Sequence, residues 1–248
     1  MVHDTTALTG RLMKAIVRSP DTIITVAIMP IAFLLLFRYV FGGAIQTGGG
    51  NYTNYLLPGI LLIAVASSVA YTAVRLFSDT QTGITARFTT MPIARSSVLW
   101  SHVLTSLVSN TVTTVVIVGV SFATGFRPRA GFLGWLAVVG ILTLFTLALT
   151  WIAVIPGLTA TSVDGAGAFA YPLIFLPFLS SAFVPTSTMP GPVRWFAENQ
   201  PVTSVVQTLR ALMEGQAAGG DIWVALAWMV GIGIIAYVVA VRAYTTVR

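Results

Sequence analysis

Long apolar runs recur along the whole chain, and polar residues gather in the short stretches between them. Each run has about the 20 apolar residues that a helix needs to cross ~30 Å of hydrocarbon. The runs are too long and too continuously apolar to be the strands of about 10 residues that build outer-membrane barrels. The pattern therefore predicts an all-α, polytopic membrane protein with six transmembrane helices, at residues 22–41, 55–77, 98–124, 132–155, 166–184 and 222–241.

A shorter amphipathic pattern precedes the first run. Leu8, Leu12 and Ile16 recur every four residues, and basic residues lie on a neighbouring face. Residues 1–20 are therefore expected to form a cytoplasmic interfacial helix. A basic leader that only sets the orientation of the chain explains the same residues equally well.

The segment between the second and third runs, residues 78–97, is longer than a connection between two spans needs. A short helix is expected from Thr80 to Thr90, and Pro92 ends it because proline biases the preceding residue away from helix. Exposed Phe88 and Met91, flanked by arginines, suit docking into a groove on a partner. An interfacial anchor on the positively charged side of the membrane is an equal alternative.

The stretch FVPTSTMPGPVRWFAENQPVTSVVQTLRALMEG, residues 183–215, separates the last two runs. From Pro201 onward the apolar and polar residues divide onto two helical faces, and Gly215 suits the end of the helix. At about 13 residues this helix is too short to span a bilayer, and Arg210 is expected to pair with Glu214 on its exposed face. Residues 185–220 are thus expected to form outer, re-entrant half-helices, with a gate made of Pro185, Trp195, Phe196, Pro201, Leu209 and Arg210.

Aromatic side chains align within two of the spans and could border a path for a large apolar substrate. The candidate pathway residues are Phe33, Phe37, Tyr71, Tyr171 and Phe175. Such stripes more often pack against neighbouring helices or face lipid, because large apolar side chains fill most such positions. Pro30, Pro172 and Pro177 are expected to bend the first and fifth spans.

Composition agrees with a bilayer protein and bears on its orientation. The chain is 56% hydrophobic and 8% charged, whereas about 25% of a soluble domain is charged. Its net charge of +6 comes from residues scattered at the ends of spans, so nucleic acid is not an expected partner. With both termini in the cytoplasm, eight of the 13 Lys and Arg residues lie inside and five outside, which favours this orientation modestly.

The sequence contains few residues that could bind a metal, catalyse a reaction or couple transport to ions. It has two histidines and no cysteine, so a metal site is not expected, and His102 is read as a polar residue at the inner end of the third span. No GxSxG, HExxH or Walker A motif occurs. Ionisable residues within the spans are also sparse, although an ion-coupled carrier needs them. The energy for any uphill transport is therefore expected to come from another chain.

The order of these segments, with RFTTMPIARSSVLW on the inner side and FVP, MP and NQPVTSVVQTLRALMEG on the outer side, resembles the membrane subunit of an ABC-2 type exporter of the daunorubicin-resistance group. The resemblance covers residues 1–248 as a single transmembrane domain. It implies a bacterial plasma (inner) membrane protein with both termini in the cytoplasm. It also implies a second permease subunit, in a homodimer or heterodimer, and two copies of an ABC ATPase that bind ATP and Mg²⁺, while this chain binds no cofactor.

The same resemblance assigns roles to the two unusual segments. Residues 78–97 would be the coupling loop that docks on the ATPase, through Arg87, Phe88, Met91, Pro92 and Arg95. The implied function is outward movement of an amphiphilic drug or lipid-like molecule. Export of polysaccharide or glycolipid by the same family, and a self-contained secondary carrier or channel, are the alternatives. A membrane enzyme acting on lipid is disfavoured by the missing catalytic cluster.

Overall fold

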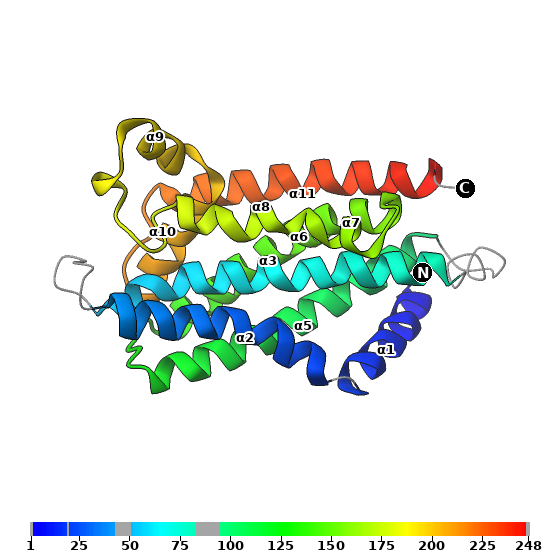
Figure 1. Cartoon of the computed structure of the whole chain (residues 1–248), viewed down its shortest axis with the longest axis horizontal. Helices are drawn as coiled ribbons and strands as arrows, with labels where there is room; N and C mark the ends of the chain where they lie inside the picture. Colours follow the sequence, from blue (N-terminus) through cyan, green and yellow to red (C-terminus); the bar gives the residue numbers. More distant parts are fainter. Residues whose placement is uncertain (1, 19, 43–50, 83–94, 247–248) are drawn as a thin grey trace.

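The computed structural model describes residues 2–18, 20–42, 51–82 and 95–246, and within these ranges every regular element is helical. Long helices run side by side, and successive helices run in alternate directions (Figure 1). One end of the bundle carries the first helix, α1 (Val2–Arg18), and the last residues of the last helix, α11 (Asp221–Thr246). We call this the α1 end. The opposite end, which carries the short helix α9 (Gly191–Asn199), is called the α9 end.

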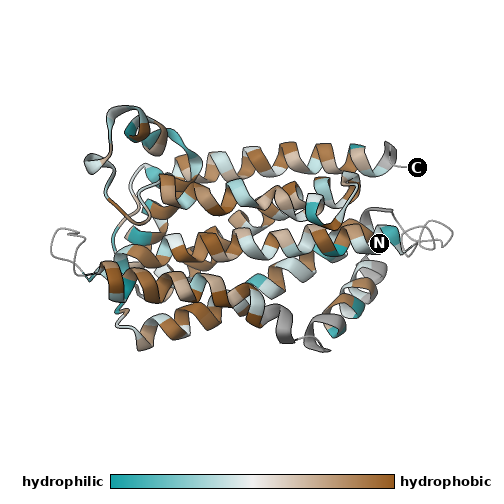
Figure 2. Ribbon diagram, in the orientation of Figure 1, coloured by the Kyte–Doolittle hydropathy of each residue, from teal (hydrophilic) through white to brown (hydrophobic). Residues whose placement is uncertain are grey.

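Five helical stretches in the described part of the chain are long and apolar enough to cross a membrane. They are formed by α2 (Pro20–Leu36) with the π-helical turn η1 (Phe37–Phe41), α3 (Tyr52–Gln81), α5 (Arg95–Ala123), α6 (Phe132–Thr159) and α11. Figure 2 shows hydrophobic residues along the length of these helices. The prediction of an all-α chain with long apolar spans is therefore confirmed for these five.

The fifth predicted span, residues 166–184, is a shorter and interrupted segment. It consists of α7 (Val163–Ala168), α8 (Ala170–Phe175) and a 3-10 turn, η2 (Leu176–Leu179). Proline lacks the N–H that a continuous helix needs, so Pro172 and Pro177 account for the expected disruption. The apolar part, Val163–Leu179, is shorter than the five long spans. Both α7 and α8 nevertheless pack along α3.

Helix α3 is the centre of the bundle (Figure 1). In its apolar window 67% of the residues are buried, against 22% for the windows of α2 and α11, which therefore present most of their surface outward. In a bilayer, small residues favour helix packing because they let backbones approach closely. A Cβ atom at Gly59 would lie 2.5 Å from the Cβ atom of Ala182, so the chain after η2 approaches α3 where α3 has no side chain.

The predicted pair of short outer helices is present in the structure. After the 3-10 turn η3 (Thr186–Thr188), α9 is followed by α10 (Pro201–Met213). The latter begins at Pro201 as expected, and the chain turns after it at Gly215, whose φ of 72° suits glycine. Helix α10 packs against α3, α6 and α11. Its apolar face is buried and consists of Val202, Val205, Val206, Leu209 and Met213.

The connection between α5 and α6 is fastened to two other elements at the α9 end. The side-chain amides of Asn51 and Asn54, at the start of α3, donate to the carbonyls of Gly125 and Arg127 at 2.5 and 2.9 Å. The amides of residues 129 and 130 donate to the carbonyl of Met213, the last residue of α10, at 3.0 and 3.2 Å. We call residues 124–130 the α5–α6 strap. It joins the start of α3 to the end of α10.

At the α1 end, the expected helix from Thr80 to Thr90 does not begin where the sequence suggested. Thr80 and Gln81 continue α3, whose buried side reaches Leu76 and Phe77, and the Thr80 hydroxyl donates to the Phe77 carbonyl at 2.6 Å. Residues 83–94 lie outside the described part of the chain. The expected amphipathic helix at the N-terminus is present as α1, which packs mainly on α5 and buries Leu12.

Candidate functional site

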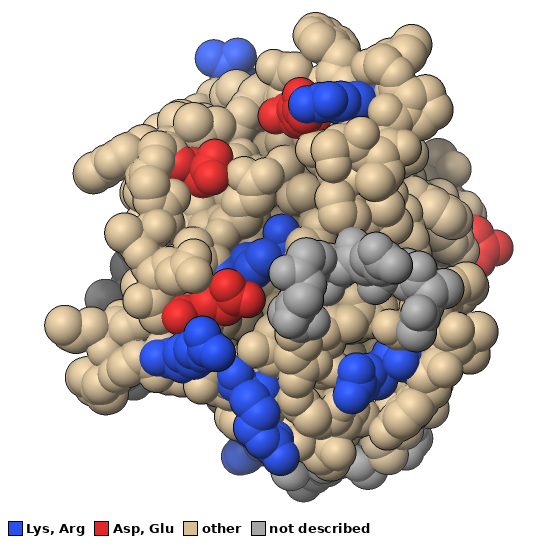
Figure 3. Space-filling view, turned by 90° about the vertical axis from the view of Figure 1, so that its left-hand side faces the viewer, with Lys and Arg blue, Asp and Glu red and all other residues tan. Residues whose placement is uncertain are grey.

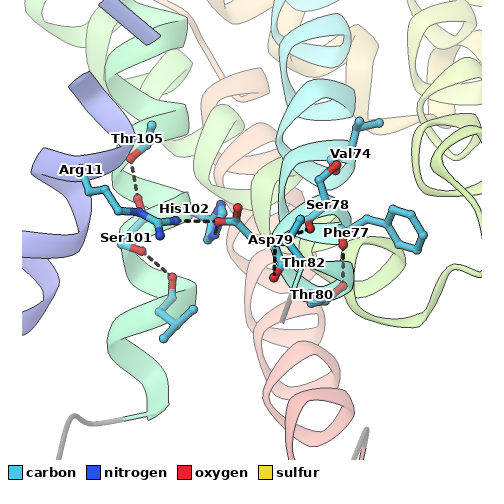
Figure 4. Close-up of polar contacts among 11 residues, drawn as sticks. Arg11, Val74, Phe77, Ser78, Asp79, Thr80, Thr82, Ser101, His102 and Thr105 are labelled. Atoms are coloured by element: carbon cyan, nitrogen blue, oxygen red, sulfur yellow. Dashed lines mark hydrogen bonds and ion pairs between the residues drawn. The ribbon is translucent and has the colours of Figure 1, made fainter. Parts of the chain in front are cut away.

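Side chains from α1, α3 and α5 meet at Asp79, near the α1 end (Figure 4). The carboxylate Oδ2 of Asp79 accepts a hydrogen bond from Nη2 of Arg11 at 2.9 Å and lies 3.4 Å from Nε2 of His102. We call these three residues the Asp79 cluster. It lies two residues before the end of α3, so it connects α1 to the two helices that flank residues 83–94.

Burial makes the Asp79 cluster more than a surface ion pair. The His102 side chain is 3% exposed and that of Asp79 is 19% exposed, whereas that of Arg11 is 42% exposed. A partly buried pair is screened by salt much less than an exposed one. The three side chains therefore hold α1, α3 and α5 together at this end. No group of three His, Cys, Asp or Glu side chains that could hold a metal ion occurs in the described residues.

Asp79 is a member of the candidate site that sequence reasoning missed. An acidic side chain in the last turn of a helix opposes the helix dipole, which favours cations there. Such a residue needs compensation from outside its own helix, and Arg11 and His102 provide it from 68 and 23 positions away along the sequence. The unfavourable placement of Asp79 was the one local signal of the site.

The residues predicted to couple the chain to an ATPase are not placed by the structure. Arg87, Phe88, Met91 and Pro92 lie outside the described residues. Arg95 is the first residue of α5, but its side chain is also outside the described part. The two helices that flank this segment, α3 and α5, both contribute to the Asp79 cluster.

At the α9 end, Arg210 points into the molecule rather than toward Glu214. Its guanidinium donates to the carbonyls of Tyr55 and Ser181, at 3.1 and 2.8 Å, and its Cζ atom lies 3.7 Å from the centroid of the Tyr55 ring. The predicted exposed pair of Arg210 and Glu214 is therefore wrong. The helical pattern identified a polar residue, but it could not show that backbone carbonyls of α3 and of the turn after η2 lie beside it.

An exposed pair does occur on α9, between Arg194 and Glu198, with Nε and Oε1 2.8 Å apart. The hydrogen bond from Arg194 holds the pKa of Glu198 below its usual value. Figure 3 shows this end of the molecule, where acidic and basic side chains lie beside one another rather than forming a single basic patch.

The other predicted gate residues occupy different environments. Leu209 is fully buried on the inner face of α10, and Pro201 is the first residue of that helix. Pro185 precedes η3, and Trp195 and Phe196 on α9 are exposed. Their role in a gate stays a prediction.

The predicted pathway residues divide into two sets. The rings of Phe33 and Phe37 pack against those of Phe178 and Phe183, with centroids 5.4 Å apart for Phe33 and Phe178 and 4.6 Å apart for Phe37 and Phe183. Phe175 is largely exposed but contacts the same group through Phe178, at 6.1 Å. Together these rings join α2 and η1 to η2.

Tyr171 and Tyr71 lie apart from this aromatic group. The side chain of Tyr171 is exposed on α8, and that of Tyr71 is exposed on α3. The guanidinium of Arg75 lies over the Tyr71 ring, 5.7 Å from its centroid. The five residues predicted for one pathway therefore do not line a common surface.

Comparison with known proteins gives a consistent result over most of the chain. The family model described as "ABC-2 type transporter" matches residues 3–213, from α1 to the end of α10. The chain is 31% identical over 242 residues to the daunorubicin resistance ABC transporter permease protein DrrB1 of Streptomyces coeruleorubidus, an alignment that covers 96% of this chain and 82% of that protein.

Two further relatives are more distant. The chain is 28% identical over 240 residues to the probable doxorubicin resistance ABC transporter permease protein DrrC of Mycobacterium tuberculosis, covering 94% of this chain and 85% of that protein. It is 26% identical over 226 residues to the putative transport permease ycf38 of Pyropia yezoensis, covering 86% of this chain and 74% of that protein.

Proposed function

Because the chain belongs to the ABC-2 type transporter family, we propose that it moves an amphiphilic, drug-like or lipid-like molecule outward across the membrane. The chain is the membrane permease component, and the ATPase activity resides in a separate subunit. The family match over residues 3–213 is the observation that carries the proposal. The names of the two relatives linked to drug resistance support a drug-like substrate.

The protein is a multi-pass membrane protein. We propose that the five long helices and the segment Val163–Leu179 make six crossings of a bacterial plasma membrane, with both termini in the cytoplasm. The joint position of α1 and the end of α11 at one end of the bundle supports an even number of crossings. In this orientation α1 is interfacial, and α9 and α10 are outer, re-entrant helices.

The proposed assembly contains this permease and the separate subunit that hydrolyses ATP. ABC permeases partner with ATP-binding subunits, and we propose two copies of that subunit and a second permease, identical or related. ATP and Mg²⁺ would bind the ATPase, and this chain would bind neither. Residues 78–97 would dock on the ATPase, and the Asp79 cluster supports this route because Asp79, near the start of that segment, joins α3 to α1 and α5.

The test is transport by the two chains together. Inverted membrane vesicles that contain this chain and its ATPase should accumulate the amphiphilic dye Hoechst 33342 when ATP is added. Vesicles with a hydrolysis-deficient ATPase should not. If this chain alone accumulated the dye without ATP, it would be a self-contained carrier. If the complete pair moved no amphiphile, the proposed substrate class would be wrong.

A further inference from the structure

A narrow polar cavity lies between α2, α3 and α5 and shares His102 with the Asp79 cluster. Of the side chains that line it, only Val26 is aliphatic; the others carry hydroxyl groups, a guanidinium or an imidazole. The helices around it are three of those long and apolar enough to cross a membrane. Several of the lining hydroxyl groups, such as those of Thr105 and Ser106, are bonded within the protein. Polar groups inside a membrane are costly unless they meet a partner, so the groups that lack one are the informative ones.

The cavity contains a positive charge that lacks an acceptor. Within the described residues, no hydrogen bond or ion pair reaches the guanidinium of Arg75; it lies 5.7 Å from the centroid of the Tyr71 ring, and the Asp79 carboxylate attracts it only at longer range. Asp79 lies one turn further along α3, but its carboxylate is already bound by Arg11 and His102. An anion in the cavity would supply what Arg75 lacks.

A second, independent group in the cavity also lacks a partner. His102 is 97% buried, and its Nδ1 atom has no hydrogen-bond partner. Because Nε2 faces the Asp79 carboxylate, Nδ1 is the ring nitrogen that is left for a ligand. A hydroxyl matches it, because a hydroxyl can both donate and accept a hydrogen bond.

We propose that this cavity binds the headgroup of an amphiphile, a phosphate with a neighbouring hydroxyl. The phosphate would accept hydrogen bonds from Arg75 and from the hydroxyl group of Ser109, since a guanidinium fits phosphate oxygens in a bidentate manner. The neighbouring hydroxyl would form a hydrogen bond with Nδ1 of His102. A cationic headgroup would instead face the charge of Arg75 without compensation.

The dimensions of the cavity indicate how the headgroup enters. The cavity is small, with about 20 Å³ of room for the centre of a water-sized sphere. That is room for about one water molecule. Tyr71 is 41% exposed and Arg75 is partly exposed, whereas His102, Thr105 and Ser106 are buried. The headgroup would therefore enter toward the phosphate-binding Arg75 by displacing the exposed Tyr71 side chain outward.

This assignment goes beyond the proposed function, because it concerns an anionic lipid that the permease holds and leaves the charge of the exported molecule open. Binding is measured by titrating the purified permease–ATPase complex in detergent with short-chain lipids by isothermal calorimetry. Dihexanoyl phosphatidylglycerol has the required phosphate and hydroxyl, and dihexanoyl phosphatidylcholine has the phosphate with a cation instead. Glycerol 3-phosphate tests whether the free headgroup is bound without its tails.

The expected result is a preference of about tenfold or more for phosphatidylglycerol, a difference that one charge-assisted hydrogen bond provides. Arg75→Gln should remove this preference, and Arg75→Lys should retain part of it. Ser109→Ala should weaken binding about threefold, as the loss of one neutral hydrogen bond does. Arg242→Gln is the matched control. It also removes one arginine charge near the α1 end, but Arg242 lies in α11, which does not line the cavity. The Arg242→Gln protein should bind both lipids like the parent.

Equal binding of the two lipids, or equal binding by the parent and Arg75→Gln, would overturn the assignment and leave the cavity to water. Tight binding of glycerol 3-phosphate, as strong as that of the lipid, would show that the ligand is a free phosphate compound and not an amphiphile. The dye-transport assay on the same preparations separates the two proposals. Transport without lipid preference refutes only the headgroup site, and lipid preference without ATP-dependent transport refutes only the export function.

Discussion

The guanidinium of Arg210 bonds three separate parts of the chain at the α9 end. It extends from α10 to the carbonyl of Tyr55 in α3 and to that of Ser181 in the turn after η2, and it stacks on the Tyr55 ring. The planar group with its fixed fork of donors can make these contacts together, and an ammonium group cannot reproduce them. Arg210 therefore has a structural role that its neighbour Glu214 does not share.

Replacement of Arg210 by Gln should lower the free energy of unfolding by about 1.5–3 kcal/mol, because hydrogen bonds to a charged group are lost and buried carbonyls lose a donor. Glu214→Ala should change it by less than about 1 kcal/mol, because Glu214 is partly exposed and forms no ion pair with Arg210. Tryptophan fluorescence during titration with SDS in mixed micelles measures both. Equal effects of the two changes would contradict the buried position of Arg210.

Asp79 is the second residue whose partners come from other helices, and a double-mutant cycle tests it. Asp79→Asn should destabilise the protein by about 1–3 kcal/mol, because Arg11 and buried His102 both lose their acceptor. Arg11→Gln should have a smaller effect, since its side chain is half-exposed. The double variant should show an interaction energy of about 0.5–3 kcal/mol in the same unfolding titration. Simple additivity would mean that the two side chains do not interact.

At the scale of the elements, the contact between α3 and the chain after η2 depends on the absence of a side chain. Gly59→Ala would place a Cβ atom 2.5 Å from that of Ala182, and overpacking of this kind typically costs about 1–3 kcal/mol. Gly140→Ala, in α6, meets nothing within 4 Å and should be neutral or stabilising by up to about 1 kcal/mol. Thermal unfolding of the two variants in detergent measures the contrast, and a stable Gly59→Ala protein would refute the close approach.

The loop at residues 78–97 gives a prediction about assembly. Phe88→Asp should weaken co-purification of the ATPase, because burial of an apolar side chain in a partner contributes about 1.5–3 kcal/mol. Arg95→Glu should leave membrane insertion intact and uncouple ATP hydrolysis from export, because the interface charge sets orientation. Membrane level, bound ATPase and substrate-stimulated hydrolysis are measured together. Normal behaviour of both variants would reduce the loop to a membrane anchor.

For the whole molecule, the arrangement of the two ends predicts a topology. A reporter fused after Arg248 should be active only in the cytoplasm. A protease site inserted after Gly219, which lies exposed between α10 and α11, should be cut only from outside in intact cells. The positive-inside rule favours this orientation only modestly. Cleavage at Gly219 only in inverted vesicles, with an externally active reporter, would reverse every inner and outer assignment.

Sequence reasoning succeeded where local pattern determines structure. Length and hydropathy identified the long spans, and the placing of Pro201 and Gly215 identified α10 almost to the residue. It failed where a residue depends on a distant partner: the amphipathic pattern placed Arg210 outside, and no pattern joined Asp79 to Arg11. The fifth span was predicted to be one continuous helix because its residues are apolar. The prolines that interrupt it were expected only to bend it.

The α5–α6 strap has a mechanical consequence. Its hydrogen bonds to Asn54 in α3 and to the end of α10 close a ring of covalent chain and hydrogen bonds at the α9 end. A closed ring resists shear between its members, so α3, α5, α6 and α10 should move there as one rigid body. Any opening at this end must then occur at a hinge outside the ring, in α2 with η1 or in α11, or as the parting of whole subunits.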